Sequence, residues 1–261
     1  MDKENNTPVV TRRPFSCRRD SLTIRGYVFR TGTEVLPAII ICHGFMADQR
    51  SVKHYAEFLA GLGMAAFTFD FCGGCLKGKS DGRQSEMSVL TEVEDLMAVI
   101  EYVRQRDDVD HEHISLIGFS QGGVVCALTA AKIPDRIERL ILIYPALCIP
   151  DDARRGRMMF AKFDPSNIPP VISHFPMKLG DVYAKAVINM NIYDEIRGYD
   201  RPVLLIHGTR DEIVDISYSR KAREVYKQCE YLEIEGAGHM FSKGHDRIAM
   251  DALEKFILSK A

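Results

Sequence analysis

The fold is decided by one stretch, Ile114-Ser115-Leu116-Ile117-Gly118-Phe119-Ser120-Gln121-Gly122-Gly123-Val124-Val125-Cys126-Ala127-Leu128. A short apolar run predicts a buried strand, Gly-x-Ser-x-Gly follows at once, and a helix-compatible run comes directly after it. So tight a turn puts Ser120 at a positive φ and presses Gly118 against Gly122, where no Cβ fits. The sequence therefore predicts a nucleophile elbow, with the Gln121 amide free at a helix N-terminus where an oxyanion could sit.

Composition points to one globular domain. A chain of 261 residues with 46% hydrophobic side chains can bury one large core, and we expect a single domain over residues 1–261 with an insertion at about 146–198. The net charge of -2, with both signs interspersed, predicts no nucleic-acid partner. The longest apolar stretches, 35–47 and 140–150, fall short of the ~20 residues that cross a bilayer, so we expect no membrane span.

The cysteines and the first residues indicate a cytoplasmic protein. Met1 to Pro8 is polar and lacks the apolar core of a signal peptide, and the seven cysteines are odd in number and scattered. A redox motif or a zinc site at Cys72-Gly73-Gly74-Cys75 would need a helix N-terminus or a second pair of ligands nearby in the sequence, and neither is evident. We interpret it as a glycine-rich connection with two free thiols, and expect no metal and no cofactor.

The chain before the elbow alternates strands with helices. We expect an antiparallel hairpin over 9–30, a strand over 36–42, a helix within 50–63, a strand over 64–69 and a loop over 70–87. A helix follows over 88–103, with Glu92, Glu94 and Asp95 in the early turns, where the helix dipole favours acids. This rhythm predicts a doubly wound α/β sheet.

The alternation of strands and helices stops after a strand over 137–144 and resumes with a strand over 202–207. The segment between them is rich in proline and too long for an ordinary loop, which favours a functional lid, although an ornamental surface insertion stays open. The chain then closes with a helix over 217–226, a strand over 231–234 and a helix over 243–258.

A serine nucleophile needs a base, and the base needs an orienting carboxylate. Asp211 and His239 follow Ser120 in the order serine, acid, histidine, each on a loop after a strand. Asp211 is preferred over Glu212 and Asp215 because it lies nearest the strand end.

Other histidines compete with His239 for the role of base. His207 lies inside a strand end, His245 falls in the final helix, and His111 and His113 flank the wrong end of the elbow strand. His239 has glycine before it on a strand-end loop, so it is the predicted base.

An oxyanion hole needs a second amide besides that of Gln121. His43-Gly44-Phe45 follows the strand over 36–42, so the Phe45 amide is in place to supply it, and Gly44 lets the backbone approach a substrate closely. The side chains of His43 and Phe45 could instead simply pack under the loop.

These motifs resemble those of the α/β-hydrolase esterases. The similarity rests on His43-Gly44-Phe45, Gly118-Phe119-Ser120-Gln121-Gly122-Gly123, His207-Gly208-Thr209-Arg210-Asp211 and Gly238-His239. Within that superfamily the chain is most similar to the bacterial cinnamoyl or feruloyl esterases with a small inserted lid, because 163–169 and 191–194 also look like theirs. The resemblance runs from about residue 20 to the end.

The resemblance implies a mostly parallel sheet with helices on both faces and hydrolysis of hydroxycinnamoyl esters. It also implies that Asp152, in the lid, binds the phenolic hydroxyl of the substrate. Two departures bear on the substrate: Cys72 to Gly78 replaces a shorter Gly-His-Gly-type turn, and Met159 stands where some relatives have a polar residue.

Three functions remain open from the sequence. The first is a cytoplasmic serine carboxylesterase of the feruloyl type. The second keeps the chemistry with a fatty acyl ester, as in monoacylglycerol lipases or general short-chain esterases, with Met158, Met159 and Phe160 as an acyl groove. The third is a catalytically silent, hydrolase-like binding protein. For the first two we expect a small-molecule ester as the partner, and a homodimer stays open.

Overall fold

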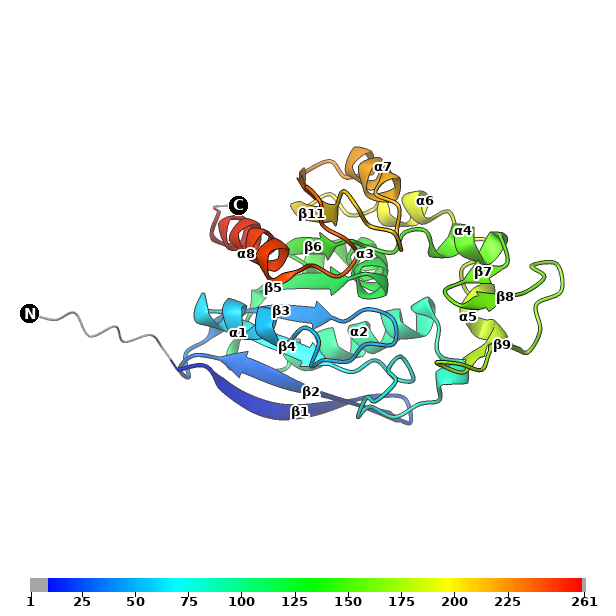
Figure 1. Cartoon of the computed structure of the whole chain (residues 1–261). Coiled ribbons are helices and arrows are strands. Elements are labelled where there is room, and N and C mark those ends of the chain that lie inside the picture. Colours follow the sequence, from blue (N-terminus) through cyan, green and yellow to red (C-terminus); the bar gives the residue numbers. More distant parts are fainter. Residues whose placement is uncertain (1–8, 260–261) are drawn as a thin grey trace, which may run out of the picture.

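A central sheet of eight strands organises the protein, which we describe over residues 9–259 from a computed structural model (Figure 1). The six strands from β4 to β12 pair in parallel, whereas β1 and β2 join antiparallel at one edge. In spatial order the strands are β1 (Thr11–Arg19), β2 (Leu22–Arg30), β4 (Ala65–Phe69), β3 (Leu36–Cys42), β5 (Val109–Phe119), β6 (Arg139–Ile143), β11 (Val203–Gly208) and β12 (Cys229–Ile234). The predicted N-terminal hairpin and α/β sheet are confirmed.

Helices cover both faces because the parallel strands are apolar on both. Ala38, Ile40 and Cys42 of β3 pack in one core with α2 (Val89–Arg104) and α3 (Gln121–Lys132). Ile39 and Ile41 pack in a second core, on the opposite face, with α1 (Lys53–Gly61) and α8 (Lys243–Leu258). Side chains alternate across a strand, so each parallel strand contributes to two cores.

Helix α2 begins at a reciprocal cap. The Ser88 hydroxyl accepts a hydrogen bond from the Thr91 amide at 3.2 Å, and the Thr91 hydroxyl accepts one from the Ser88 amide at 2.9 Å. The three acids lie in the early turns of α2, as predicted, but two of them are buried. Glu92 and Asp95 are 1% and 0% exposed and face other side chains, and only Glu94 faces solvent.

The segment 146–198, which the sequence predicts to be an insertion and which we call the insertion, lies between β6 and β11, beyond the carboxyl ends of the parallel strands (Figure 1). The Arg154 guanidinium ties it together by donating to the carbonyls of Ile188 and Met190 at 2.9 and 3.0 Å. Its elements are α4 (Ile149–Arg154), β7 (Arg157–Met158), β8 (Ala161–Lys162), β9 (Val171–Ser173), β10 (Leu179–Gly180), α5 (Asp181–Lys185) and α6 (Ile192–Ile196).

Helix α7 (Ser217–Val225) connects β11 to β12, as predicted, and η1 (Gln84–Glu86) and η2 (Pro134–Arg136) are single 3₁₀ turns. Across residues 9–259, every helix is too short or too polar to span a bilayer.

Candidate active site

Ser120 stands at the turn between β5 and α3 with φ +53°. A Cβ on Gly118 would lie 2.3 Å from the carbonyl oxygen of Gly122, and one on Gly122 would lie 2.4 Å from that of His43. Both distances are far below van der Waals contact, so the elbow closes only with glycine at these two positions. The serine side chain is thereby held at the carboxyl end of the sheet.

The structure brings Ser120, His239 and Asp211 together. His239 Nε2 lies 2.9 Å from Ser120 Oγ, and His239 Nδ1 lies 2.7 Å from Asp211 Oδ2. Asp211 follows β11 and His239 follows β12, so adjacent parallel strands deliver both side chains to the same edge. Because a carboxylate only accepts, the Nδ1 atom carries the proton and the Nε2 lone pair faces the serine hydroxyl.

Asp211 is fully buried but held ionised by four donors. Burial raises its pKa, but hydrogen bonds from the imidazoles of His207 and His239 and from backbone amides lower it by more, so the net pKa is below the usual value. Oδ1 accepts from the amides of Ile213 and Val214, each at 2.9 Å, and Oδ2 accepts from the two imidazoles. The carboxylate is therefore fixed in both charge and orientation.

His207 contacts the Asp211 carboxylate, which the sequence analysis did not predict. Its Nε2 lies 3.1 Å from Asp211 Oδ2 and 3.0 Å from the Val214 carbonyl, while Nδ1 lies 2.7 Å from the Ser219 hydroxyl. Both neighbours of Nε2 are acceptors, so Nε2 carries the proton and donates to the acid. The predicted structural role thus extends to the carboxylate itself, and the His-Gly-Thr-Arg-Asp spacing is the signal that could have found it.

The other candidates for acid and base lie elsewhere. Glu212 is exposed, and the Asp215 carboxylate accepts from the Ser217 amide at 2.8 Å at the start of α7. Of the histidines considered as the base, His111 and His113 lie near the start of β5, at the opposite end of the strand from Ser120, and His245 lies on α8.

Two backbone amides, those of Gln121 and Phe45, are predicted to bind an oxyanion. Gln121 is the first residue of α3, so its N–H has no partner within the helix. A Cβ on Gly44 would lie 3.1 Å from Ser120 Cβ, so the turn that carries the Phe45 amide lies directly against the serine. The Phe45 ring stacks on Tyr183 at 5.4 Å, while His43 is buried beneath the loop, as the packing alternative expected for these side chains.

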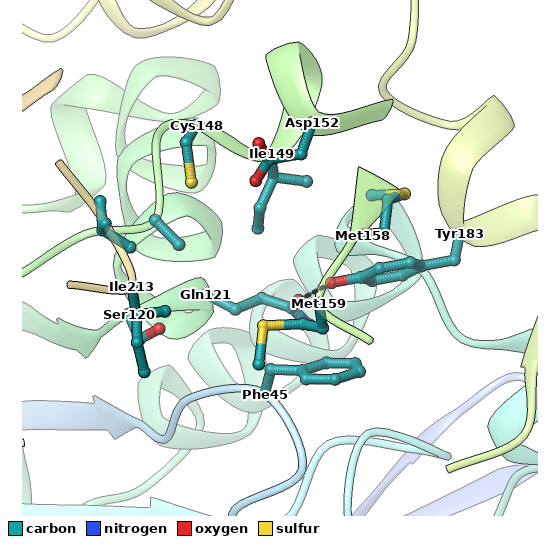
Figure 2. A pocket seen from close by; sticks show the side chains of 12 residues that line it. Phe45, Ser120, Gln121, Cys148, Ile149, Asp152, Met158, Met159, Tyr183 and Ile213 are labelled. Atoms are coloured by element: carbon teal, nitrogen blue, oxygen red, sulfur yellow. Dashed lines mark hydrogen bonds between the residues drawn. The ribbon is translucent and has the colours of Figure 1, made fainter. Parts of the chain in front are cut away.

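A hollow with about 410 Å³ of unfilled space opens from Ser120 toward the insertion. Figure 2 shows Asp152 on α4 across this hollow from the Phe45 ring, with Met159 between Ser120 and Tyr183 in the view. Burial raises the pKa of Asp152, partly offset by the Cys148 thiol and the charge of Arg155. We name this hollow the lid-side pocket; its other lining residues are Gln121, Ala146, Cys148, Ile149, Met158, Ile213 and Val214.

Beneath the lid-side pocket lies a buried polar network that the sequence did not reveal. The Tyr183 hydroxyl donates to Gln121 Oε1 at 2.5 Å, a bond drawn in Figure 2, and Gln121 Nε2 donates to Glu92 Oε2 at 2.8 Å. Burial raises the pKa of Glu92 well above its usual value. The insertion, the elbow helix and α2 therefore meet at Gln121, whose amide is predicted to bind the oxyanion.

One group of metal-ligand types occurs among residues 9–259. The donor atoms of His43, Asp70 and Cys75 lie within 4.8 Å of one another, all buried. Protein donors already occupy them: the Phe71 amide reaches His43 Nε2 at 3.2 Å, and the amides of Gln49 and Lys79 reach the Asp70 carboxylate. Cys72 and Cys75 are both free thiols, as expected.

The fold and the site define an α/β hydrolase. Residues 33–172 match the model of the Hydrolase_4 family, described as serine aminopeptidase S33, and the chain belongs to that family.

Among solved structures, the chain is similar to Est1E from Butyrivibrio proteoclasticus with ferulic acid bound. The TM-score is 0.86 at 30% identity, covering 94% of this chain and 98% of that one. Among curated proteins, the uncharacterized peptidase YtmA of Bacillus subtilis (strain 168) is 26% identical over 197 residues, 70% of each chain. An uncharacterized 31.7 kDa protein from the traX-finO intergenic region of Escherichia coli is 33% identical over 88 residues, or 33% of this chain. The match spans only 30% of that relative's length.

Proposed function

We propose that the chain is a serine carboxylic ester hydrolase that acts through an acyl-enzyme on hydroxycinnamoyl, feruloyl-type esters. The observation that carries the proposal is the continuous line of hydrogen bonds from Asp211 through His239 to Ser120 at the mouth of the lid-side pocket. A hydroxyl paired with an oriented imidazole is the arrangement that activates a serine nucleophile.

The reaction follows from the geometry in two halves. His239 Nε2 takes the Ser120 proton as Oγ attacks the ester carbonyl carbon, and the amides of Phe45 and Gln121 stabilise the resulting oxyanion. The intermediate collapses by breaking the bond to the alcohol oxygen, which receives the proton from His239. Water then attacks the acyl-enzyme, gives a proton to His239, and the carboxylic acid leaves as Ser120 recovers its proton.

The lining of the lid-side pocket suits an aromatic acyl group. Phe45 and Tyr183 supply ring faces, and Asp152 supplies a half-buried carboxyl on the far wall, in place to meet a phenolic hydroxyl. The similar Est1E structure was solved with ferulic acid. In this proposal residues 146–198 act as the lid of a single domain, and the free thiols suit the reducing cytoplasm.

Covalent labelling tests the chemistry. We expect a fluorophosphonate probe to label the wild-type chain at one site, because the probe needs an activated serine. Ser120→Ala abolishes labelling, whereas Ser166→Ala, at an exposed serine of the insertion, retains it. A folded wild type that stays unlabelled and inert toward short p-nitrophenyl esters would instead establish the catalytically silent binding protein.

A matched substrate pair tests the acyl group. We expect kcat/KM to be higher for methyl ferulate than for methyl 3,4-dimethoxycinnamate, which lacks the phenolic hydroxyl. Asp152→Ala should remove the difference, whereas Asp151→Ala, at the neighbouring carboxylate bound to Tyr218, should preserve it. Equal rates for the two esters in the wild type would contradict the assigned role of Asp152.

The apolar lining favours a second candidate, a fatty acyl ester. Ile149, Met158 and Met159 all face the lid-side pocket, and methionine adapts readily to flexible chains. Phe160, by contrast, is 68% exposed and lies outside the lining. Faster hydrolysis of medium-chain monoacylglycerols than of methyl ferulate would select this candidate.

The description of the matched family names a peptidase. Hydrolysis of aminoacyl p-nitroanilides would test this chain for that activity.

A further inference from the structure

A second hollow opens on the other side of Ser120. It holds about 730 Å³ of unfilled space and shares Phe45 and Ser120 with the lid-side pocket, but only this hollow is lined by His239. We name it the His239-side cleft. Besides the shared residues, its distinctive lining is Ser51, His54, Tyr144, Met240, Phe241 and Asp246.

The chemistry assigns the two hollows to the two halves of an ester. The base that takes the serine proton returns it to the leaving oxygen, so the alcohol must depart on the side of the imidazole. The acyl group then occupies the lid-side pocket and the alcohol occupies the His239-side cleft. This step rests on the proposed ester hydrolysis.

The charge in the His239-side cleft is negative. Asp246, on α8, is its only carboxylate, and neither lysine nor arginine is among the residues that line it. The Tyr55 hydroxyl donates to Asp246 Oδ1 at 2.8 Å, and His54 Nε2 lies 3.6 Å from Oδ2. The Asp246 side chain retains 27% exposure, so a bound alcohol can reach it.

Two tyrosines of the cleft lie within the electrostatic influence of Asp246. Burial raises the pKa of Tyr55 and Tyr144 above the usual value, and the negative charge of Asp246 raises both further. Tyr144 and Phe241 form an edge-to-face pair at 4.9 Å, and the Tyr144 ring lies 4.7 Å from His239. Aromatic faces beside a carboxylate are the surroundings that favour a quaternary ammonium.

We propose that the His239-side cleft binds the alcohol half of the ester and that Asp246 selects it by charge. Ammonium-bearing alcohols are preferred, uncharged alcohols are accepted, and carboxylate-bearing alcohols are disfavoured. The lid-side pocket is untouched by this selection because the acyl group is the same in each case.

Four ferulate esters test the proposal: methyl, choline (cationic), 2-hydroxyethyl (neutral) and carboxymethyl (anionic). For each ester, kcat/KM of Asp246→Asn is divided by that of the wild type, which cancels the differing reactivity of the alcohols. Assays run at low salt and pH 8, above the range in which exposed imidazoles gain a proton. Asparagine keeps an oxygen for the Tyr55 hydroxyl, so the variant retains its fold.

We expect Asp246→Asn to lower kcat/KM for the choline ester about three- to tenfold, to raise it similarly for the carboxymethyl ester, and to leave the neutral esters within about twofold. Asp251→Asn, an exposed acid on the same helix, should change none of them. Met240→Lys, at an 85% exposed rim position, should favour the carboxymethyl ester.

A uniform change across all four esters, or no change at all, would overturn the selection by charge. If the wild type hydrolysed neither methyl ferulate nor any other ester, the proposed function itself would be overturned. Failure of the charge selection can therefore be distinguished from failure of the proposed ester hydrolysis.

Discussion

Glu92 shows what burial does to a single residue. Its carboxyl is 1% exposed and accepts from the Gln121 side chain, and desolvation raises its pKa well above the usual glutamate value of 4.5. The folded state therefore binds a proton that the unfolded chain releases. The stabilising contribution of Glu92 is present below about pH 4.5 and is lost, by about 1.4 kcal/mol per pH unit, as the pH rises toward the folded-state pKa.

Glu92→Gln removes that pH dependence because the amide cannot ionise. We expect the free energy of unfolding of the variant, relative to the wild type, to increase between pH 5 and pH 8 in chemical denaturation. Glu94→Gln, on the same helix but with its side chain 61% exposed, should show no such trend. A constant difference for Glu92→Gln across this range would mean that Glu92 is ionised in the folded protein.

Under the proposed mechanism, His207 acts through Asp211 rather than on a substrate. In His207→Leu the carboxylate loses one donor and holds the imidazolium of His239 more strongly, so we expect the acid limb of the kcat/KM profile to move to higher pH. We expect kcat/KM to fall about ten- to a hundredfold, since a hydrogen bond to a charged group contributes about 1.5–3 kcal/mol.

Ser219→Ala is the matched control for His207→Leu, because it removes the partner of Nδ1 and leaves the bond to Asp211. Its acid limb should stay in place. Lower activity of His207→Leu with an unmoved limb would reduce His207 to a packing role.

At the scale of elements, the elbow is a sterically constrained junction between β5 and α3. Gly122→Ala places a Cβ 2.4 Å from the His43 carbonyl oxygen, a backbone atom that cannot rotate away. We expect a loss of at least about 3 kcal/mol in the free energy of unfolding, in the range of severe overpacking.

Gly61→Ala gives the comparison within a helix. Nothing lies within 4 Å of a Cβ there, at the end of α1, so we expect thermal unfolding to show unchanged stability or a gain of about 0.4–1 kcal/mol. Similar melting temperatures for the two glycine variants would contradict the steric account of the elbow.

For the molecule as a whole, the reactivity of the seven cysteines measures how well the packed cores exclude a reagent. All seven are free, and five are buried. The two half-buried thiols are weakly acidic as well: burial and the charge of Asp95 raise the pKa of Cys17 to about 11, and burial raises that of Cys229 to about 11. At pH 8 roughly one in a thousand of such thiols is ionised.

Thiol titration measures this protection. We expect the native protein at pH 8 to react with Ellman's reagent at a small fraction of the rate of free cysteine, because only the thiolate attacks. After denaturation without reductant, seven thiols should react. A lower number would indicate a disulfide, and rapid native reaction would indicate that the cores open readily.

The sequence by itself determined the features that depend on local sterics and chain order. Gly-x-Ser-x-Gly between a strand and a helix allows one backbone path, and the alternation of strands and helices leads to a mostly parallel sheet. Since parallel strands end at one edge, residues that follow different strands were expected together, and Asp211 and His239 do meet there.

Tertiary structure alone decided the surroundings of those residues. That Glu92 is buried under Gln121, that a second imidazole reaches Asp211, and that Asp246 faces the cleft beside His239 all depend on partners distant in the chain. Helical spacing indicated only that acids lay near the start of α2. Whether a carboxyl meets water, an amide or another charge is fixed by packing between elements, and that packing sets its ionisation.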